Sequence, residues 1–342
     1  MSSNIKYRTF KNGDVPGLTE VWNTVKSRDY LPFETNFEVI LTSVLFNPED
    51  LIVAVDTEGT PSNPFVSEGK IVGFIHGGFG PLADNMTLDY SMGTIAMLRV
   101  VPREEREEIA QNLLDLLEKR FQSLGVKKIS AGAVYPHAPF YMEQLSTGEL
   151  HGIIETSTFA VELLKKNHYV VDSTYELYRI DMSGGLPAIP VRFVKLMNQY
   201  ERKHQESTLE SSNWWKCQAF RNVHRKTFYL IDYVTEEVIA CTSSHSFTPT
   251  DATEEEKKVA DENAIGTKSV YSTVHDLYVA PEYRHCGLAE CLVDSVLRDL
   301  FAHGTKIVEL QLPEVNRAAR RTFQNLNFTH FTNSYVFCKV LD

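Results

Sequence analysis

The chain has 342 residues, a formal net charge of −11 and a sequence pI near 5.5, with 43% hydrophobic and 23% charged residues. This composition is that of a folded globular protein and excludes wholesale disorder, and the length allows about two domains of roughly 150 residues each. The acidic balance argues against nucleic-acid and anionic-membrane partners, because both require clustered cationic surface.

The five cysteines all lie in the second half of the chain, at positions 217, 241, 286, 291 and 338. Their odd number and scattered spacing suit neither a disulfide framework nor a Cys-x-x-Cys metal clip, so we expect reduced thiols, no metal and a cytoplasmic location. The first residues, "MSSNIKYRTFKNGD", have no apolar core after a positive segment. No run of about 18 apolar residues occurs, so neither a secretory signal nor a membrane span is expected.

Hydrophobic periodicity predicts a mixed α/β first half. Its clearest helix begins at Glu104, because apolar residues then recur at spacings of three and four until Gly125 ends the pattern. The expected buried stripe of this helix is Ile109, Leu113, Leu116, Leu117 and Phe121. In chain order, strands are expected at 51–56, 70–79, 94–101 and 126–134, and helices at 104–125 and 157–169.

The segment 182–190, "MSGGLPAIP", contains two glycines and two prolines in nine residues and predicts a connector between domains. We therefore expect an N-terminal domain over residues 1–182 and a C-terminal domain over 183–342. An acidic insert at 248–268 is typical of a solvated loop. The second half is expected to have helices at 191–204, from 287 onward and within 316–328, and strands at 217–222, 226–233, 237–247, 270–279, 306–312 and 330–340.

The two halves can be aligned on each other, which indicates an internal repeat. "LRVVPREEREEIAQNLL" matches "LYVAPEYRHCGLAECLV" with Pro102 on Pro281, a constant offset of 179 residues. "STFAVELLKKNHY" matches "NRAARRTFQNLNF" with Ala160 on Ala319, an offset of 159. The difference of 20 residues places an extra loop near 131–150, and duplication of one fold is the simplest account.

The turn "RHCGLA" connects a short strand to an amphipathic helix of the second half. The first turn of such a helix has free backbone N–H groups and the positive end of the helix dipole, so it can bind a phosphate or pyrophosphate. Gly287 and Ala289 allow close approach to the backbone, and Arg284 adds a positive charge. The expected buried stripe of the helix is Leu288, Leu292, Val293, Val296, Leu297, Leu300 and Phe301.

The pattern Arg284-x-x-Gly287-x-Ala289 after the strand "HDLYV" resembles the coenzyme A signature Q/R-x-x-G-x-G/A of the GNAT superfamily of N-acetyltransferases. "NRAARRTFQNLNF" is similar to the second motif of that family, N-x-x-A-x-x-x-Y-x-x-x-G-F. The resemblance covers about residues 190–342 and, through the repeat, the first half more weakly. It implies an α/β (α+β) fold of two tandem domains, each a mixed, mostly antiparallel twisted sheet flanked by helices, with acetyl-CoA as cosubstrate.

The resemblance also implies which groups hold acetyl-CoA. The backbone amides of the turn would bind the pyrophosphate, and the strand 277–279 would hydrogen-bond the pantetheine arm. The amide of Val279 would face the thioester oxygen, where negative charge grows in the transition state, and Asn316 would hydrogen-bond the pantetheine. The implied cofactor-binding residues are Leu277, Tyr278, Val279, Arg284, His285, Cys286, Gly287, Leu288, Ala289, Asn316 and Phe323.

Catalysis in this family is direct attack of an amine on the thioester, so a base or a water relay must remove a proton. His275 stands where relatives with an E-D-L-Y-V pattern carry a glutamate base, and the ordinary histidine pKa of about 6.5 suits this role near neutral pH. The alternative is a strand histidine satisfied by a neighbour. Asp276 should point to the opposite face of the strand and be structural, because successive strand side chains alternate.

Two positions depart from the family pattern. Phe323 replaces the tyrosine that often protonates the departing thiolate, and Asn327 replaces the usual glycine. The proton would then come from water, from Tyr283 or from Tyr335, or would not be needed. Cys286 lies in the phosphate turn, so we do not expect it to be a nucleophile.

The first half lacks the coenzyme A features at matching positions. Glu105 and Glu108 stand at its arginine and glycine positions, so charge and side-chain volume both oppose a pyrophosphate. A shifted register on Arg103 or Arg106 is the alternative, but no glycine follows either residue. Such a degenerate domain could shape the acceptor pocket, close the sheet edge of its partner or bind a ligand of its own.

We therefore expect an acyltransferase that acts on a small-molecule or peptide amine. The loop 134–143, rich in Tyr, Pro and His, could line the acceptor pocket or be pinned by its own aromatic residues. One alternative is a coenzyme A-binding sensor or scaffold without turnover, and the other is a transferase of related fold that uses a different donor.

Overall fold

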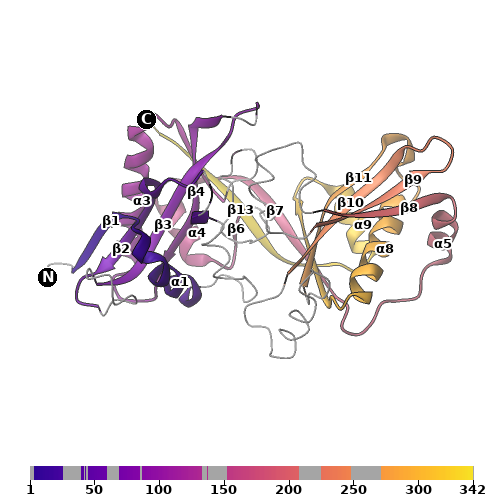
Figure 1. The fold of residues 1–342 in the computed structure, drawn as a ribbon, viewed down its shortest axis with the longest axis horizontal. Helices are drawn as coiled ribbons and strands as arrows, with labels where there is room; N and C mark the ends of the chain where they lie inside the picture. Colours follow the sequence, from indigo (N-terminus) through magenta and orange to yellow (C-terminus); the bar gives the residue numbers. More distant parts are fainter. Residues whose placement is uncertain are drawn as a thin grey trace. The chain divides into compact units, whose positions relative to one another are not determined.

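The computed structural model describes residues 4–25, 40–41, 43, 45–59, 69–84, 87–132, 137, 152–207, 225–247 and 271–341 (Figure 1). The chain divides into two compact units, and each unit combines segments that are distant in sequence. The first unit consists of Met1–Thr174, Ser211–Ala219 and Ser334–Asp342, and the second of Tyr175–Glu210 and Phe220–Asn333.

The first unit is built on a sheet with the strand order β1-β2-β3-β4-β5-β13. Neighbouring strands are antiparallel except β4 and β5, which are parallel. The short strand β6 (Ile153–Ile154) also pairs with β13. The strands of this sheet are β1 (Ile5–Thr9), β2 (Leu51–Asp56), β3 (Lys70–Pro81), β4 (Leu88–Val100), β5 (Lys128–Ala131) and the end of β13 (Thr329–Val340).

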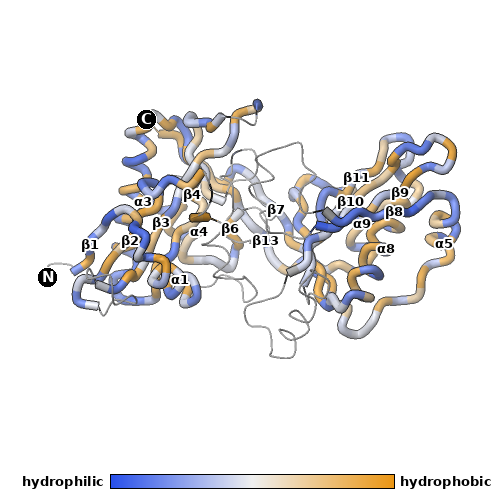
Figure 2. Tube along the Cα trace, in the orientation of Figure 1, coloured by the Kyte–Doolittle hydropathy of each residue, from blue (hydrophilic) through white to orange (hydrophobic). Residues whose placement is uncertain are grey.

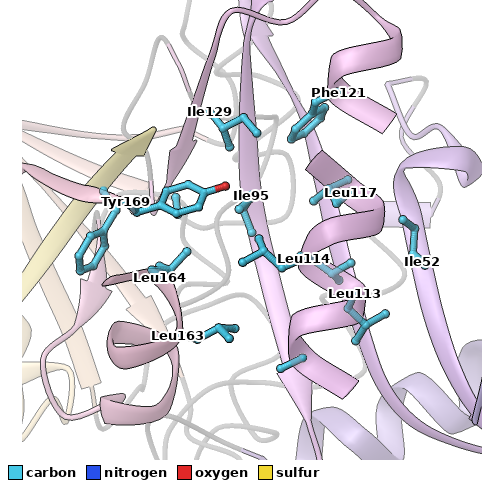
Figure 3. Packing of buried hydrophobic residues seen from close by; sticks show 14 of the residues in the cluster. Ile52, Ile95, Leu113, Leu114, Leu117, Phe121, Ile129, Leu163, Leu164 and Tyr169 are labelled. Carbon is cyan, nitrogen blue, oxygen red and sulfur yellow. The ribbon is translucent and has the colours of Figure 1, made fainter. Parts of the chain in front are cut away.

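Both faces of this sheet carry an apolar core. On one face α3 (Arg106–Ser123) and α4 (Thr158–Lys166) bury their apolar side chains, and Figure 3 shows Leu113, Leu117 and Phe121 packed beside Ile95 and Ile129. On the other face α1 (Val15–Thr24) covers a second apolar cluster. One 3-10 turn, Asn12–Asp14, precedes α1, and another, Pro48–Asp50, precedes β2. The predicted stripe of α3 is confirmed except that Leu114 is buried while Leu116 is only partly buried.

The second unit is built on a sheet with the strand order β7-β12-β11-β10-β9-β8. Only β11 and β12 are parallel. Its helices are α5 (Val191–Met197), α8 (Leu288–Ala302) and α9 (Arg317–Asn325), with a 3-10 turn at Pro281–Tyr283. Its strands are β7 (Val170–Asp181), β8 (Tyr200–Ser207), β9 (Arg225–Asp232), β10 (Val238–Phe247), β11 (Tyr271–Val279) and β12 (Ile307–Pro313).

The helix predicted over 191–204 is wrong beyond its first half. The helix α5 ends at Met197 and the strand β8 begins at Tyr200. This strand is hydrophilic along its length (Figure 2), so its sequence carries no strong period, and antiparallel pairing with β9 decides its conformation. The strand predicted at 217–222 lies outside the described residues.

The two faces of the second sheet differ in polarity. Helix α8 buries the predicted stripe against one face, except that Phe301 is 42% exposed because it lies in the last turn, and Cys291 joins the core instead. The opposite face is polar, and its central side chains are buried. One row of directly paired residues crosses five strands of that face: Arg225, His245, Thr273, Glu309 and Arg179.

Strands β7 and β13 each contribute to both units. Residues 175–181 of β7 pair with β12 in the second unit, although they precede the second repeat in sequence. Residues 337–340 of β13 pair with β5 in the first unit, where Phe337 lies opposite Ala131. Each compact unit is therefore completed by a strand from the other half of the chain. The predicted domains, residues 1–182 and 183–342, describe the two sequence repeats, and their boundary stays a prediction.

Candidate functional site

The central feature of the second unit is the separation of two parallel strands. β11 and β12 pair only at Tyr271 with Ile307, Ser272 with Val308 and Thr273 with Glu309. Beyond Thr273 the strand β11 continues to Val279, where its other edge still pairs with β10. Among the described residues, β12 thus pairs with β11 only as far as Thr273, and an extended ligand could pair with the main chain of Leu277 to Val279.

A β-bulge in β11 lies beside this opening. His275 pairs with Ser243 and Tyr278 pairs with Cys241, so β11 has one more residue than β10 between these pairs. Asp276 lies in the bulge and adopts a left-handed backbone conformation, with φ of 55°. The hydroxyl of Thr242 donates a hydrogen bond of 2.9 Å to the carbonyl oxygen of His275.

The pairing of β11 with β10 beyond the bulge directs the main chain of Val279 away from β10. The amide of Ala280 donates to the carbonyl of Ile239 at 2.8 Å, so the next pair toward the bulge, Val279 with Ala240, does not exchange hydrogen bonds. The N–H and C=O of Val279 therefore point away from β10, and those of Leu277 do so by the same alternation. Tyr278 lies opposite Cys241, and its side chain is 47% exposed.

The bulge also contradicts the prediction that Asp276 points away from His275. A carboxylate oxygen of Asp276 lies 3.4 Å from Nδ1 of His275. The guanidinium of Arg225 donates to Asp276 at 2.9 Å and to Ser243, the cross-strand partner of His275, at 2.9 and 3.1 Å. Because the left-handed residue interrupts the alternation of side chains, both groups lie on one face of the sheet.

Two histidines are stacked at this place. The rings of His275 and His245 have centroids 4.3 Å apart and planes inclined by 41°. His245 is fully buried, whereas the His275 side chain is 13% exposed. His275 is therefore held between a histidine and a carboxylate, in the part of β11 that runs on past its pairing with β12.

The predicted phosphate turn follows β11 directly. Gly287 has φ of 89° and occupies the N-cap of α8, and a Cβ added there would meet only a side-chain carbon of Leu196 at 3.8 Å. The turn thus needs glycine for its backbone conformation and leaves open space above it. His285 is also left-handed, with φ of 63°, and it is exposed.

The side chains of the turn have distinct environments. The exposed Arg284 donates from Nε to the carbonyl oxygen of Val279 at 2.9 Å, which fixes the arginine beside the opening. The Cys286 thiol donates to the carbonyl of Tyr283 at 2.8 Å. Leu288 is buried in the core, so only its backbone faces the turn, and Ala289 is partly buried.

The second predicted motif forms the start of α9. Asn316 is its N-cap, and its side-chain oxygen accepts a hydrogen bond of 3.1 Å from the amide of Ala319. Phe323 is buried in the core and packs edge-on against Phe328 with ring centroids 5.4 Å apart. A buried phenyl ring donates no proton, so the site lacks a general acid at this position.

The two alternative proton donors lie in different surroundings. The hydroxyl of Tyr283 lies 3.5 Å from a carboxylate oxygen of Asp232, and desolvation together with this carboxylate raises the pKa of Tyr283. Tyr335 belongs to the first unit, where its hydroxyl donates to Glu155 at 2.8 Å. The loop 134–143 lies outside the described residues apart from His137.

The corresponding turn of the first unit is built differently. Arg106 donates from Nε to the carbonyl of Val100 at 3.1 Å, the same contact that Arg284 makes in the second unit, and its guanidinium stacks 3.8 Å above the ring of Phe159. Arg103 forms ion pairs with Asp56 at 3.0 Å and with Glu105 at 2.9 Å. A shifted arginine is therefore present, as the alternative register predicts, but no left-handed glycine follows it.

A cleft of about 920 Å³ lies at this turn of the first unit. Four carboxylates line it, and only three cations accompany them. In the second unit the repeat position of Phe159 is occupied by Ala318. The first unit thus combines acidic side chains with an aromatic ring where the second unit has small residues. The cleft is lined by Arg103, Glu104, Glu105, Arg106, Glu107, Glu108, Gln111, Asn112, Phe159 and Lys166.

Within the described ranges, no cluster of three or more His, Cys, Asp or Glu side chains could hold a metal ion. None of the described helices is long and apolar enough to cross a membrane.

Several solved structures share the fold of this chain. A GCN5-related glucosamine N-acetyltransferase region of a fungal multi-domain GH3 β-N-acetylglucosaminidase is similar over 99% of this chain, with a TM-score of 0.65 and 14% identity, and this chain spans 38% of that one. A tandem GNAT protein from the clavulanic acid biosynthesis pathway is similar over 98% of both chains, with a TM-score of 0.60 and 14% identity. A GCN5-related N-acetyltransferase from Sphaerobacter thermophilus is similar over 99% of this chain and 96% of that one, with a TM-score of 0.59 and 12% identity. The chain therefore has the tandem GNAT fold.

A family model matches part of the second half of the chain. Residues 192–328 match the model of the Acetyltransferase (GNAT) family. No curated protein sequence matches the chain. This matched segment is a GNAT-family domain, and it contains the opening between β11 and β12, the bulge and the glycine turn.

Proposed function

We propose that the second unit binds acetyl-CoA in the opening between β11 and β12 and transfers the acetyl group to a primary amine. The observation that carries this proposal is the continuity of the site: β11 runs on past the end of its pairing with β12 and leads directly into a turn with a left-handed glycine and an exposed arginine. This part of the strand matches an extended pantetheine arm, and the turn at the N-terminus of α8 matches a pyrophosphate. Both features fit acetyl-CoA.

In the proposed reaction the acceptor arrives as an ammonium ion and first loses one proton to His275, which leaves a neutral amine; the second proton leaves the nitrogen for water after the N–C bond has formed. The amine nitrogen then forms a bond to the thioester carbon, and negative charge grows on the carbonyl oxygen, where the amide of Val279 donates a hydrogen bond. The C–S bond breaks and coenzyme A leaves as a thiolate. Because Phe323 is buried in the core, water or Tyr283 protonates the thiolate.

The remaining predicted contacts stay part of this proposal. The amides from Arg284 to Ala289 hold the pyrophosphate, and the strand Leu277 to Val279 holds the pantetheine arm. The Nδ2 group of Asn316 can donate to the same arm while its oxygen caps α9. Phe323 contributes only by packing in the apolar core of the second unit. The cytoplasmic location expected from the free cysteines stays a prediction.

A thermal-shift experiment tests the binding site. Saturating acetyl-CoA at about 100 times Kd should stabilise the wild type by about 2.7 kcal/mol, which corresponds to a rise in Tm of roughly 5–10 °C. Gly287→Glu should lose this rise, because a side chain and a charge then occupy the pyrophosphate position. Glu108→Gly, the matched change in the first unit, should keep it. Full stabilisation of Gly287→Glu would show that the site is misplaced, and no stabilisation of the wild type would point to a different donor.

Turnover over an amine panel separates an enzyme from a sensor. The fungal region of similar fold is a glucosamine N-acetyltransferase, so glucosamine belongs in the panel together with polyamines and a lysine peptide. His275→Ala should reduce kcat by roughly 10²- to 10⁴-fold, the usual contribution of a general base. Binding of acetyl-CoA without turnover on any amine would favour a coenzyme A sensor or scaffold.

A further inference from the structure

A hydrogen bond at the end of β11 joins the strand to the turn that follows it. The Nε group of Arg284, in the turn, donates at 2.9 Å to the carbonyl oxygen of Val279, the last residue of the strand. The same peptide is held at its other end, because the N–H of Ala280 donates to the carbonyl of Ile239 at 2.8 Å. The peptide between Val279 and Ala280 is therefore fixed on one side by the turn and on the other by the chain that leads into β10.

The first unit contains an equivalent hydrogen bond. Val100 is the repeat position of Val279, and its carbonyl oxygen accepts from Nε of Arg106 at 3.1 Å. Arg106 is not the repeat position of Arg284, which is Glu105. The two arginines thus reach equivalent carbonyls from different positions in their turns, so the contact has been kept although the position of the arginine has shifted.

The turn of the first unit does not suit an anion. Glu108 stands at the position of Gly287, so a side chain and a negative charge replace the glycine. The guanidinium of Arg106 lies 3.8 Å above the ring of Phe159, and the face of an aromatic ring attracts a cation. The hydrogen bond therefore occurs without the features of a pyrophosphate site, and holding the end of the strand is the role that the two arginines share.

We propose that Arg284 is a positioning residue, which contributes to acetyl transfer by holding the main chain of Val279 rather than by binding the pyrophosphate. The proposal rests on the proposed function, in which the amide of Val279 donates to the thioester oxygen. The N–H and C=O of one strand residue point to the same side. An uncovered carbonyl of Val279 would thus place partial negative charge near the growing oxyanion, and Arg284 offsets that charge.

The hydrogen bond also fixes the direction of the amide. A donor stabilises an oxyanion effectively when its position is set before the reaction. The bulge at Asp276 interrupts the regular pairing of β11 with β10 three residues before Val279. Arg284 supplies a second attachment for the strand end beyond this bulge.

Steady-state kinetics with acetyl-CoA separate the two roles of the arginine. Arg284→Ala should lower kcat by roughly 10- to 100-fold, less than the loss of a whole oxyanion donor, with the KM for acetyl-CoA within about twofold. Arg284→Gln should stay within about fivefold of the wild-type kcat, because Nε2 of glutamine is as many bonds from Cα as Nε of arginine and keeps the donor without the charge.

The matched control is Arg202→Ala, which removes another exposed arginine from the same unit. The guanidinium of Arg202 lies 3.8 Å from the sulfur of Met197, and its loss should leave kcat and KM unchanged. S-acetylpantetheine gives a second readout, because it lacks the pyrophosphate. Arg284→Ala should lower kcat/KM by the same factor with this donor as with acetyl-CoA.

Two results would overturn the proposal and assign Arg284 to the pyrophosphate. One is a raised KM for acetyl-CoA at unchanged kcat in both Arg284 variants, and the other is a loss of kcat/KM that is confined to acetyl-CoA. A wild-type protein that binds acetyl-CoA but acetylates no amine would instead refute the proposed function, and this proposal with it.

Discussion

Phe337 tests whether the last strand of the chain stabilises the first unit. Its side chain is fully buried in the apolar cluster that α3 and α4 share with the first sheet. Its backbone pairs with Ala131 of β5, and its carbonyl oxygen accepts a hydrogen bond of 3.1 Å from the hydroxyl of Ser130. The perturbation is Phe337→Ala, which removes the ring and leaves a cavity in this apolar cluster.

Truncation of a fully buried phenylalanine costs about 3–5 kcal/mol. For a unit of this size, each kcal/mol lowers Tm by about 2–4 °C, so the transition of the first unit should fall by roughly 6–20 °C. The matched control is Val340→Ala in the same strand, where the side chain is 71% exposed and the expected change is within about 0.5 kcal/mol.

Hydrogen exchange locates the effect. In Phe337→Ala, amides of β4 and β5 should lose protection, while those of β10 should keep it, because the latter belong to the second unit. Loss of protection in β10 with β5 unchanged would refute the assignment of this strand to the first unit. A variant that fails to accumulate can be replaced by Phe337→Leu, for which the same pattern is expected at smaller amplitude.

Three further predictions concern single side chains. Gly287→Ala should destabilise the second unit by about 1 kcal/mol, because φ of 89° disfavours a side chain, and weaken acetyl-CoA binding in the same thermal-shift assay; an unchanged Tm would contradict the need for glycine. Burial lowers the pKa of His76 to about 3, so folding keeps this residue neutral while the unfolded chain binds a proton below about pH 6.5. The stability contributed by neutral His76 is therefore complete above pH 6.5 and lost as pH falls toward 3. Between pH 7 and pH 5, the free energy of unfolding in urea should fall less for His76→Gln than for the wild type. Equal falls in the two proteins would argue against this assignment. Cys286→Ser should leave kcat and the KM for acetyl-CoA within about twofold, because the thiol only donates to the carbonyl of Tyr283, and a large fall in kcat would return this thiol to the mechanism.

The helices α3 and α8 and the glycine turn were predictable from local signals. A helical stripe of apolar residues, a proline before the turn and a glycine with a positive φ are determined by neighbours within a few residues. The internal repeat also showed which turn had lost its glycine. The sequence offered Arg106 only as an alternative to the regular arginine position in the first unit. Its position is fixed by contacts with the carbonyl of Val100 and with the ring of Phe159, which lies 53 residues further along the chain.

The strand β8 and the position of Asp276 were predicted wrongly for one shared reason. Local patterns assume regular alternation or a regular helical period, whereas pairing with a neighbouring strand decides both segments. In β11 the pairing with β10 admits one extra residue, and that residue turns Asp276 toward His275 and Arg225. No spacing in the sequence marks this bulge.

The sequence by itself determined the family segment, the position of the phosphate turn and the presence of His275 before the strand "LYV", since these depend on residues close together in the chain. The tertiary structure alone decided the environment of His275 and the composition of the two compact units. His275 is surrounded by residues of β9 and β10, and β7 and β13 each contribute to both units. Such contacts form between segments that are distant in sequence, and their register is chosen by the whole sheet rather than by any local pattern.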